Sequence, residues 1–450
     1  PTTDNPGVTD PADPDDPDEP TGFTENLSFF LIKNGTAYAV NRIGTATNEK
    51  IVIPPVHKGL PVTCIYYSAF SGCNSITNVI IPDSVTDIYS GAFSFCNNLI
   101  SVTIPDSVTS IGTFAFQDCN SLTSVTLPRT LNKISDYTFY NCKSLDSITI
   151  PNTVTEIGDY AFYNCSSLTE ATIPNDVTVI GWGAFEGCSA LKKVTIPNSV
   201  SAIDCSAFSD CTSLTDVVIG NGITTLNKEL FSGCNSLTSV TFPESLTSIG
   251  DSVFNNCSSL TSITFPKNLT SIGSMAFYKC SSITEIVIPD NVTSIGGSAF
   301  DYCNSLASIT IPDSVTEIGT SFKDSAYYNN ESNWENDVLY IGKHLIEARD
   351  TISDSYEIKS GTKTIASGAF RDCKLLTSIT IPYGVKNIGY SAFSNCYKLT
   401  AVAIPGSVTN IESSAFSDCY NLSEVTIADG IINIGTSAFD GCSKLTEITI

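Results

Sequence analysis

Cysteine forms the most regular chemistry-bearing pattern in this sequence. Fifteen of the seventeen cysteines recur every 23 residues, from Cys73 to Cys303 and again from Cys373 to Cys442, and each follows a phenylalanine by three residues. Successive slots would lie about 5 Å apart, within reach of a disulfide ladder, but parallel side chains pointing into one core have poor geometry for that bond. We therefore expect buried free thiols, because free Cys packs as a small hydrophobe.

The other reactive side chains do not combine into a catalytic or metal site. Cys64 and Cys205 fall outside the periodic slot and lie six repeats apart, about 30 Å at about 4.8 Å per strand, so they cannot bond to each other. The two histidines, His57 and His344, lie in different irregular segments, and no CxxC pair accompanies the thiols. No phosphate-binding loop, dinucleotide fingerprint or distinct carboxylate pair is present. We predict no catalytic residue, no metal and no cofactor, and hence no enzyme.

The spacing of residues within the 23-residue repeat also predicts the secondary structure of each repeat. Val125 and Leu127 are two residues apart, as in a short strand with one buried face, and Pro128 ends that strand. Phe139 and Cys142 are three apart, which matches a helical turn. Each unit should therefore supply one inward strand and, on the opposite side, a short helical or 3-10 turn. Such a unit cannot bury its apolar residues alone, so the units must stack into a solenoid.

Composition excludes several classes of protein. Of the 450 residues, 42% are hydrophobic and 15% are charged, which is enough apolar material for a long core. The formal net charge of -24, with no basic stripe, argues against binding of nucleic acid. No run of 18 or more apolar residues occurs, so we expect no membrane span.

The chain divides into three segments, and the third contains an insert. Residues 1–22 alternate Pro with acidic residues and read as a disordered, extended linker; its prolines oppose the wrap that a calcium loop needs. Residues 23–50 contain two apolar runs around Asn34-Gly35 and predict an N-terminal capping hairpin. Residues 51–450 form the solenoid. An insert at about 320–352 breaks the period and predicts a second hairpin, Val338 to Ile341 with His344 to Ala348.

The repeat LxxVxIPxxVxxIGxxAFxxCxx resembles the leucine-rich repeats of BspA-like bacterial surface proteins over about 400 residues. The resemblance implies an α/β-class leucine-rich repeat solenoid that is dominated by β-structure, with a concave parallel sheet and short turns on the convex side. It also implies an extracellular protein, attached to the cell surface or secreted, that binds host or partner-cell proteins. The family motif fixes no ligand residue, so none is carried over.

Candidate ligand contacts lie where the repeat departs from uniformity or faces outward. The outward strand slot is mostly Thr, which includes Thr126, Thr149 and Thr172, although Thr also supports a sheet without any ligand. Glu170, Lys192, Lys193 and Asp216 interrupt the Ser and Thr pattern in three successive units, and either a charged contact or a solvated face explains them. Tyr327, Tyr328 and Trp334 concentrate aromatic side chains in the insert, where they either anchor a partner or pack the hairpin.

These observations favour a non-catalytic, adhesin-like protein-binding module whose ligand is a host matrix protein or a partner-cell protein. The alternative is a structural spacer or self-associating envelope scaffold, for which a uniform Thr and Ser face is equally suitable. The sequence stops at Ile450 inside an expected inward strand, and an open parallel edge recruits other chains. We therefore expect either a homodimer formed through the C-terminal edge or weak protection of residues 445–450.

Overall fold

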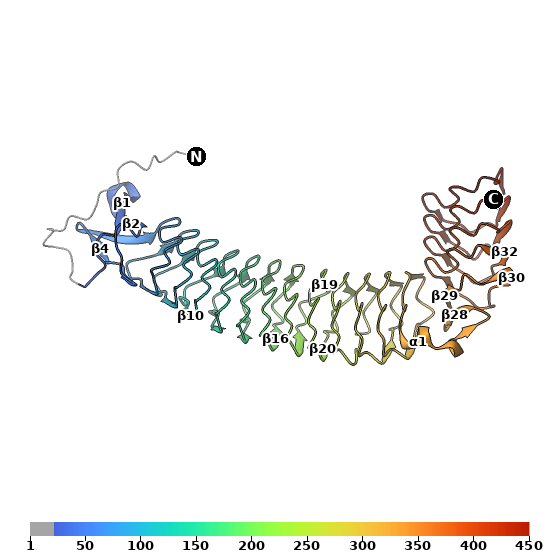
Figure 1. The fold of residues 1–450 in the computed structure, drawn as a ribbon, viewed down its shortest axis with the longest axis horizontal. Helices are drawn as coiled ribbons and strands as arrows, with labels where there is room; N and C mark the ends of the chain where they lie inside the picture. The colour runs from blue at the N-terminus through green and yellow to red at the C-terminus, as the bar shows by residue number, and fades with distance from the viewer. Residues whose placement is uncertain (1–21, 450) are drawn as a thin grey trace. The chain divides into compact units, whose positions relative to one another are not determined.

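The computed structural model describes residues 22–449, so the expected linker, apart from Gly22, lies outside the described residues. These residues form two compact units. Unit 1 runs up to Ile223 and includes Leu230–Thr241, and unit 2 comprises Thr224–Glu229 and the chain from Phe242 onward. Within each unit the chain winds into stacked coils, drawn as a ladder of similar loops in Figure 1.

Most regular coils carry two short strands, which form two parallel walls, although the sequence predicts one. In wall A, strand β10 (Ser124–Thr126) pairs in register with β8 (Ser101–Thr103). In wall B, strand β11 (Lys133–Ile134) pairs with β13 (Glu156–Ile157). The second strand was missed because only two residues belong to it. Neighbouring coils nevertheless align Ile134 on Ile157, and both side chains are buried.

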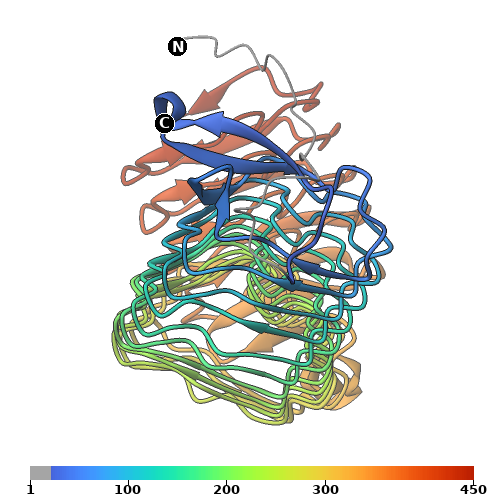
Figure 2. The same ribbon diagram turned by 90° about the vertical axis from the view of Figure 1, so that its left-hand side faces the viewer.

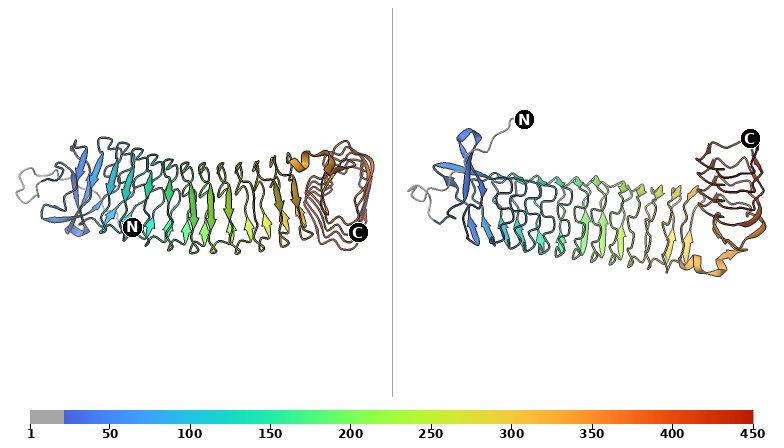
Figure 3. Two further views of the ribbon diagram at one scale, coloured as in Figure 1. Left: turned by 90° about the horizontal axis from the view of Figure 1, so that it is seen from below. Right: turned by 45° about the horizontal axis from the view of Figure 1, so that its top comes forward.

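Wall A contains strands from both units, and those of unit 1 lie side by side in the left-hand view of Figure 3. In unit 1 they are β3 (Lys50–Val52), β6 (Asn78–Ile80), β8, β10, β12 (Ser147–Ile148), β14 (Glu170–Ala171), β16 (Lys193–Ile196), β18 (Asp216–Ile219) and β20 (Ser239–Thr241). In unit 2 they are β23 (Glu285–Val287), β25 (Ser308–Thr310), β30 (Ser353–Glu357), β32 (Leu375–Thr380), β34 (Ala401–Ile404), β36 (Glu424–Ile427) and β38 (Ile448–Thr449).

Apart from β5, the strands of wall B have two residues each. In unit 1 they are β5 (Leu60–Ile65), β7 (Asp87–Ile88), β9 (Ser110–Ile111), β11, β13, β15 (Val179–Ile180) and β17 (Ala202–Ile203). In unit 2 they are β19 (Thr225–Leu226), β21 (Ser248–Ile249), β22 (Ser271–Ile272), β24 (Ser294–Ile295), β26 (Glu317–Ile318), β31 (Thr364–Ile365), β33 (Asn387–Ile388), β35 (Asn410–Ile411) and β37 (Asn433–Ile434).

The remaining side of each coil, here called the turn wall, contains single turns in place of helices. In one coil, Tyr140 N–H bonds to the Tyr137 carbonyl and Cys142 N–H to the Phe139 carbonyl, which are i→i−3 bonds of the 3-10 kind. The residues two before and two after Phe139, Tyr137 (φ 57) and Asn141 (φ 59), adopt the left-handed conformation. The same two positions are left-handed around every periodic Phe, and this conformation ends a right-handed helix after one turn.

The core of each unit is a column of stacked phenylalanine rings beside a column of thiols. Phe162, Phe185 and Phe208 are fully buried, with ring centroids 5.1 and 5.3 Å apart. Cys188 donates its S–H to the Phe162 carbonyl of the preceding coil at 3.2 Å, and burial raises the pKa of Cys188 to about 12. The slot therefore requires a small side chain that also donates a hydrogen bond. All seventeen cysteines are thiols, and Cys73 and Cys205 are the two that are only half-buried.

A β-hairpin covers the first coil of unit 1. Strand β1 (Ser28–Ile32) pairs antiparallel with β2 (Ala37–Arg42) through the one-turn 3-10 segment η1 (Lys33–Gly35). Strand β2 then pairs parallel with β5, so the hairpin extends wall B, and Figure 2 shows it across the end of the coils. The short strand β4 (Val56–His57) pairs with β5 in the loop of the first coil.

The insert of unit 2 contains one short α-helix, α1 (Ala326–Asn329), a 3-10 turn, η2 (Glu331–Asn333), and three antiparallel strands, β27 (Trp334–Glu335), β28 (Val338–Ile341) and β29 (His344–Ala348). The pairing of β28 with β29 confirms the hairpin expected from the sequence. Just before the insert, Phe322 stacks on Phe300 at 5.4 Å, so the ring column extends one coil further than the strict 23-residue period indicates.

Candidate functional site

Several of the candidate ligand contacts, both the outward threonines and the charged residues that replace Ser or Thr in the repeat, lie on wall A of unit 1. Thr126 lies in β10 and Thr149 directly after β12, both with exposed side chains. Glu170 lies in β14 and Thr172 directly after it, and both are exposed. Stacking therefore brings these candidate residues onto one outward face, as the period predicts.

Lys193 and Asp216 contact each other across neighbouring coils. They are paired positions of β16 and β18, and Lys193 Nζ lies 3.8 Å from Asp216 Oδ2. Asp216 also accepts hydrogen bonds from the Thr215 hydroxyl at 2.8 Å and the Ser239 hydroxyl at 3.0 Å. These two bonds, and then Lys193, lower the pKa of Asp216, so it stays ionised. Both partners are exposed, and such a pair adds little stability.

A groove of about 680 Å³ opens on this face. Its walls include Glu170, Thr172, Lys192, Lys193 and Thr195. The groove lies where wall A is interrupted, because β12 and β14 form one ladder and β16, β18 and β20 another.

Backbone spacing agrees with this interruption. The bond from Lys192 N–H to the Thr169 carbonyl is 3.4 Å, whereas the equivalent bond one coil later, from Thr215 N–H to the Lys192 carbonyl, is 2.9 Å. Two adjacent exposed lysines at a groove, in a chain of net charge -24, offer a local cationic contact beside the carboxylate of Glu170. The charged residues could be identified from the sequence, but the groove could not, because it depends on the separation between two neighbouring coils.

The three aromatic candidates of the insert make contacts within the insert itself. Trp334 Nε1 donates to the Tyr328 carbonyl at 2.7 Å, and the two rings meet edge to face at 5.2 Å. Tyr327 donates its hydroxyl to the Tyr340 carbonyl at 3.0 Å, and Tyr328 donates to Glu347 Oε1 at 2.9 Å. All three candidate side chains are partly buried. These contacts favour the packing alternative over a free aromatic anchor.

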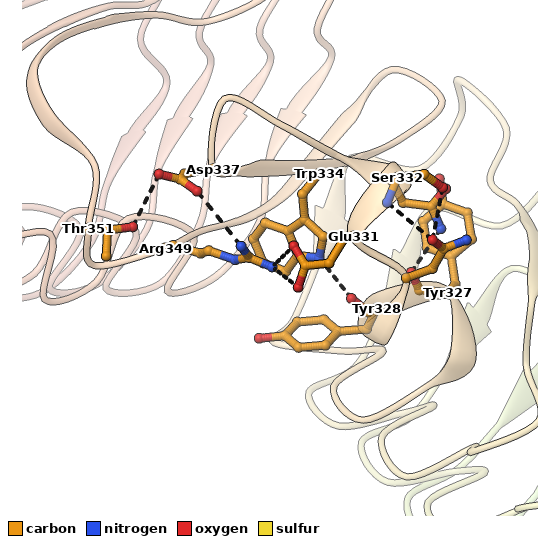
Figure 4. Close-up of polar contacts among 10 residues, drawn as sticks. Tyr327, Tyr328, Glu331, Ser332, Trp334, Asp337, Arg349 and Thr351 are labelled. Atoms are coloured by element: carbon orange, nitrogen blue, oxygen red, sulfur yellow. Dashed lines mark hydrogen bonds and ion pairs between the residues drawn. The ribbon is translucent and has the colours of Figure 1, made fainter.

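Arg349 completes this cluster, as Figure 4 shows. Its guanidinium lies 4.4 Å from the centre of the Trp334 ring and donates to both carboxylate oxygens of Glu331 at 2.8 and 2.7 Å. A second carboxylate, that of Asp337, lies 3.8 Å away. One guanidinium nitrogen, Nη2, makes both bonds to Glu331, so Arg349 links Glu331 to the Trp334 ring within the insert.

The structure reveals an aromatic surface that the sequence analysis missed. On the turn wall of unit 1, Phe114, Tyr137 and Tyr160 form one stacked row, with centroids 4.7 and 5.1 Å apart. Tyr140 and Tyr163 form a second row beside it, stacked at 4.7 Å. The signal was available, because aromatic residues recur at 23-residue spacing in these two slots.

The histidines occupy separate packing environments. His57 is buried and stacks on Phe29 at 4.2 Å. His344 is buried in the insert, where Nε2 lies 3.1 Å from the Pro312 carbonyl. Over residues 22–449, no group of three or more His, Cys, Asp or Glu side chains is arranged to hold a metal ion. Within the same range, no helix is both long enough and apolar enough to cross a membrane.

Comparison with known proteins identifies the repeat. The model of the BspA type leucine-rich repeat region matches in four overlapping stretches, 48–159, 87–215, 132–260 and 201–331, and in a separate stretch, 340–450. The comparison with curated proteins gives no match.

Several solved structures with similar chains are described as leucine-rich proteins. One, from Bacteroides ovatus, is 28% identical, with 94% of this chain and 92% of that chain covered and a TM-score of 0.46. A leucine-rich repeat protein of T. pallidum is also 28% identical, with 54% of this chain and 90% of that chain covered and a TM-score of 0.32. A leucine rich cell surface protein of Faecalibacterium prausnitzii is 25% identical, with coverage of 96% and 95% and a TM-score of 0.27.

Proposed function

Because the chain belongs to the BspA-type leucine-rich repeat family, whose solenoids are generally scaffolds for protein binding, we propose that it is a non-catalytic, adhesin-like module that binds a host matrix protein or a partner-cell protein. We place it outside the cell, attached to the surface or secreted, as the family resemblance implies.

The groove on wall A of unit 1 carries this proposal. It combines an open volume of about 680 Å³ with Glu170, Lys192 and Lys193, the charged residues that depart from the Ser and Thr pattern. A protein ligand with an acidic segment would pair with the two lysines, while the threonines donate and accept neutral hydrogen bonds. The aromatic rows on the turn wall of the same unit provide a second contact surface of a kind common in protein interfaces.

The test uses a variant that restores the repeat pattern. Lys192→Thr with Lys193→Ser returns both positions to the residues of the coil at Thr123 and Ser124, so folding should be unchanged. The double variant Lys267→Asn with Lys279→Asn is the control, since it removes the same charge from exposed positions of unit 2. Immobilised protein is presented with purified matrix proteins and with surface extracts of neighbouring cells.

We expect a micromolar partner whose affinity falls at least about 10-fold in the groove variant, equal to about 1.4 kcal/mol, and is unchanged in the control. Equal losses in the two variants would assign the binding to net charge alone. Light scattering at rising concentration tests the alternative, a self-associating scaffold, for which mass should increase with concentration and no foreign partner should be captured.

A further inference from the structure

Unit 2 contains an internal corner at the insert. Ser367 N–H bonds to the Ile318 carbonyl at 2.8 Å, and the Thr364 hydroxyl bonds to the Val315 carbonyl at 3.0 Å. Because of these bonds, the wall B strands after the insert lie against the wall B strands before the insert. Figures 1 and 3 show the two sets of coils of unit 2 running in different directions.

A cavity of about 320 Å³ lies inside this corner. Strands from both sides line it, with Glu317 from the coils before the insert and Asn387 and Glu412 from the coils after it. Part of the lining is glycine, including Gly296 and Gly319. An added Cβ at Gly319 would lie 2.4 Å from the backbone of Gly297, so a side chain cannot fill the space from this position.

The corner buries Asn387, a residue whose slot is exposed in some other coils of unit 2. It holds the same slot as Glu317 and Asn433, whose side chains are exposed, yet Asn387 is only 3% exposed. Among the described residues its side-chain oxygen, Oδ1, has no hydrogen-bond partner. A buried amide oxygen without a donor is unfavourable, so a ligand that brings an N–H group into the cavity would satisfy it.

The charges around the cavity all have one sign. Burial, and then the negative charge of Glu317, raise the pKa of Glu412. Asp251 adds a third carboxylate, with Oδ1 already accepting the Ser274 N–H at 2.7 Å, and no lining side chain is basic. A cation in the corner would relieve the repulsion between Glu317 and Glu412.

An exposed aromatic ring completes the lining. Tyr390 is 56% exposed and lines the same cavity. A planar cation can stack on such a ring while its edges donate to carboxylates, which is the geometry of a guanidinium group. A bare metal ion suits the corner less well, because the described residues supply no group of three His, Cys, Asp or Glu ligands.

We propose that the corner of unit 2 is a pocket for an arginine side chain of a partner protein. The guanidinium donates to Glu412 and Glu317, gives one N–H to Asn387 Oδ1, and stacks on Tyr390. This inference rests on the proposed protein-binding function, and it adds a contact with the partner in unit 2 to those proposed in unit 1.

The test measures peptide binding directly and needs no natural partner. The full chain is titrated with a short labelled peptide that contains one arginine, and with matched peptides that carry citrulline or lysine at that position. We expect the arginine peptide to bind at least about 10-fold tighter than the citrulline peptide, which keeps the shape but lacks the charge. It should also exceed the lysine peptide, which lacks the planar fork.

Glu412→Gln and Tyr390→Ala should each weaken arginine binding several-fold, with melting temperature and circular dichroism verifying the fold. Glu424→Gln removes the same charge from an exposed position of wall A and should leave binding unchanged. Equal binding of the lysine and arginine peptides, equal losses in Glu412→Gln and Glu424→Gln, or displacement of the peptide by submillimolar calcium would overturn the pocket. Failure here with a partner still captured through Lys192 and Lys193 would leave the proposed function standing.

Discussion

Replacement of Phe185 by alanine tests the stacked core of unit 1 most directly. Phe185 is fully buried between Phe162 and Phe208, with ring centroids 5.1 and 5.3 Å away. Removal of a buried Phe side chain costs about 3–5 kcal/mol when the site cannot collapse. Collapse is opposed here because the backbone of each coil bonds to the next, with Phe185 N–H to the Ala207 carbonyl and Phe162 N–H to the Ala184 carbonyl, both at 2.8 Å.

The loss should fall in the upper half of that range, because two ring stacks disappear as well and each contributes about 0.5–1.5 kcal/mol beyond its buried area. Urea unfolding followed by hydrogen exchange measures it, with the largest loss of protection expected in the coils on either side of residue 185. Phe95→Ala serves as the control, since this ring is 46% exposed and its removal should cost below about 1 kcal/mol. If Phe185→Ala also costs less than about 1 kcal/mol, the assignment of this slot to the core is wrong.

Three further predictions concern thiols and pH. Thiol titration of the denatured chain without reductant should find most of the seventeen cysteines free; recovery of only one or two would mean that the column is oxidised. In the folded chain, Cys205 should react with an alkylating reagent before Cys211, because Cys205 is half-buried and Cys211 fully buried, and mass spectrometry reads the order directly. Burial lowers the pKa of His344 from its usual 6.5, so the folded state favours the neutral ring. Its contribution to stability should therefore be complete above pH 6.5 and decline as pH falls below it, and urea unfolding that shows no smaller acid sensitivity in His344→Gln would contradict this.

Much of the fold could be predicted from the 23-residue period. Residues that share a slot share an environment, so spacing alone was enough to assign Phe185 and Cys188 to the core, and Thr126 and Glu170 to an outward strand face. Other features required geometry that the period does not contain. The strand of wall B has only two residues per coil, and the left-handed residues around each Phe are of many types, including Tyr137 and Asn141.

The two cavities depended on relations between coils. The groove at Lys193 follows from an interruption between β14 and β16, which sequence alone does not locate. The burial of Asn387 could not be predicted either, because Glu317 and Asn433 in the same slot are exposed and only the corner buries this one. Glu412 was a missed signal, since it stands where most coils have the glycine of the IG pair. The sequence shows that Glu412 replaces the glycine, but its role in a cavity follows only from the strands that lie opposite it in the corner.

The fixed left-handed residues of the turn wall have a consequence for how genes of this kind can change length. Each coil must bring its two left-handed positions into register with those of its neighbours, because Tyr137 N–H bonds to Asp159 O and Phe139 N–H to Ala161 O, one coil on. Unequal recombination between near-identical repeats adds or removes whole coils and preserves this register, whereas a frame-preserving change of one or two codons does not. Such exchanges would leave every coil foldable while they alter the number of coils between the groove and the corner, so the spacing of the two contacts along the chain could vary among descendants without any change in either contact.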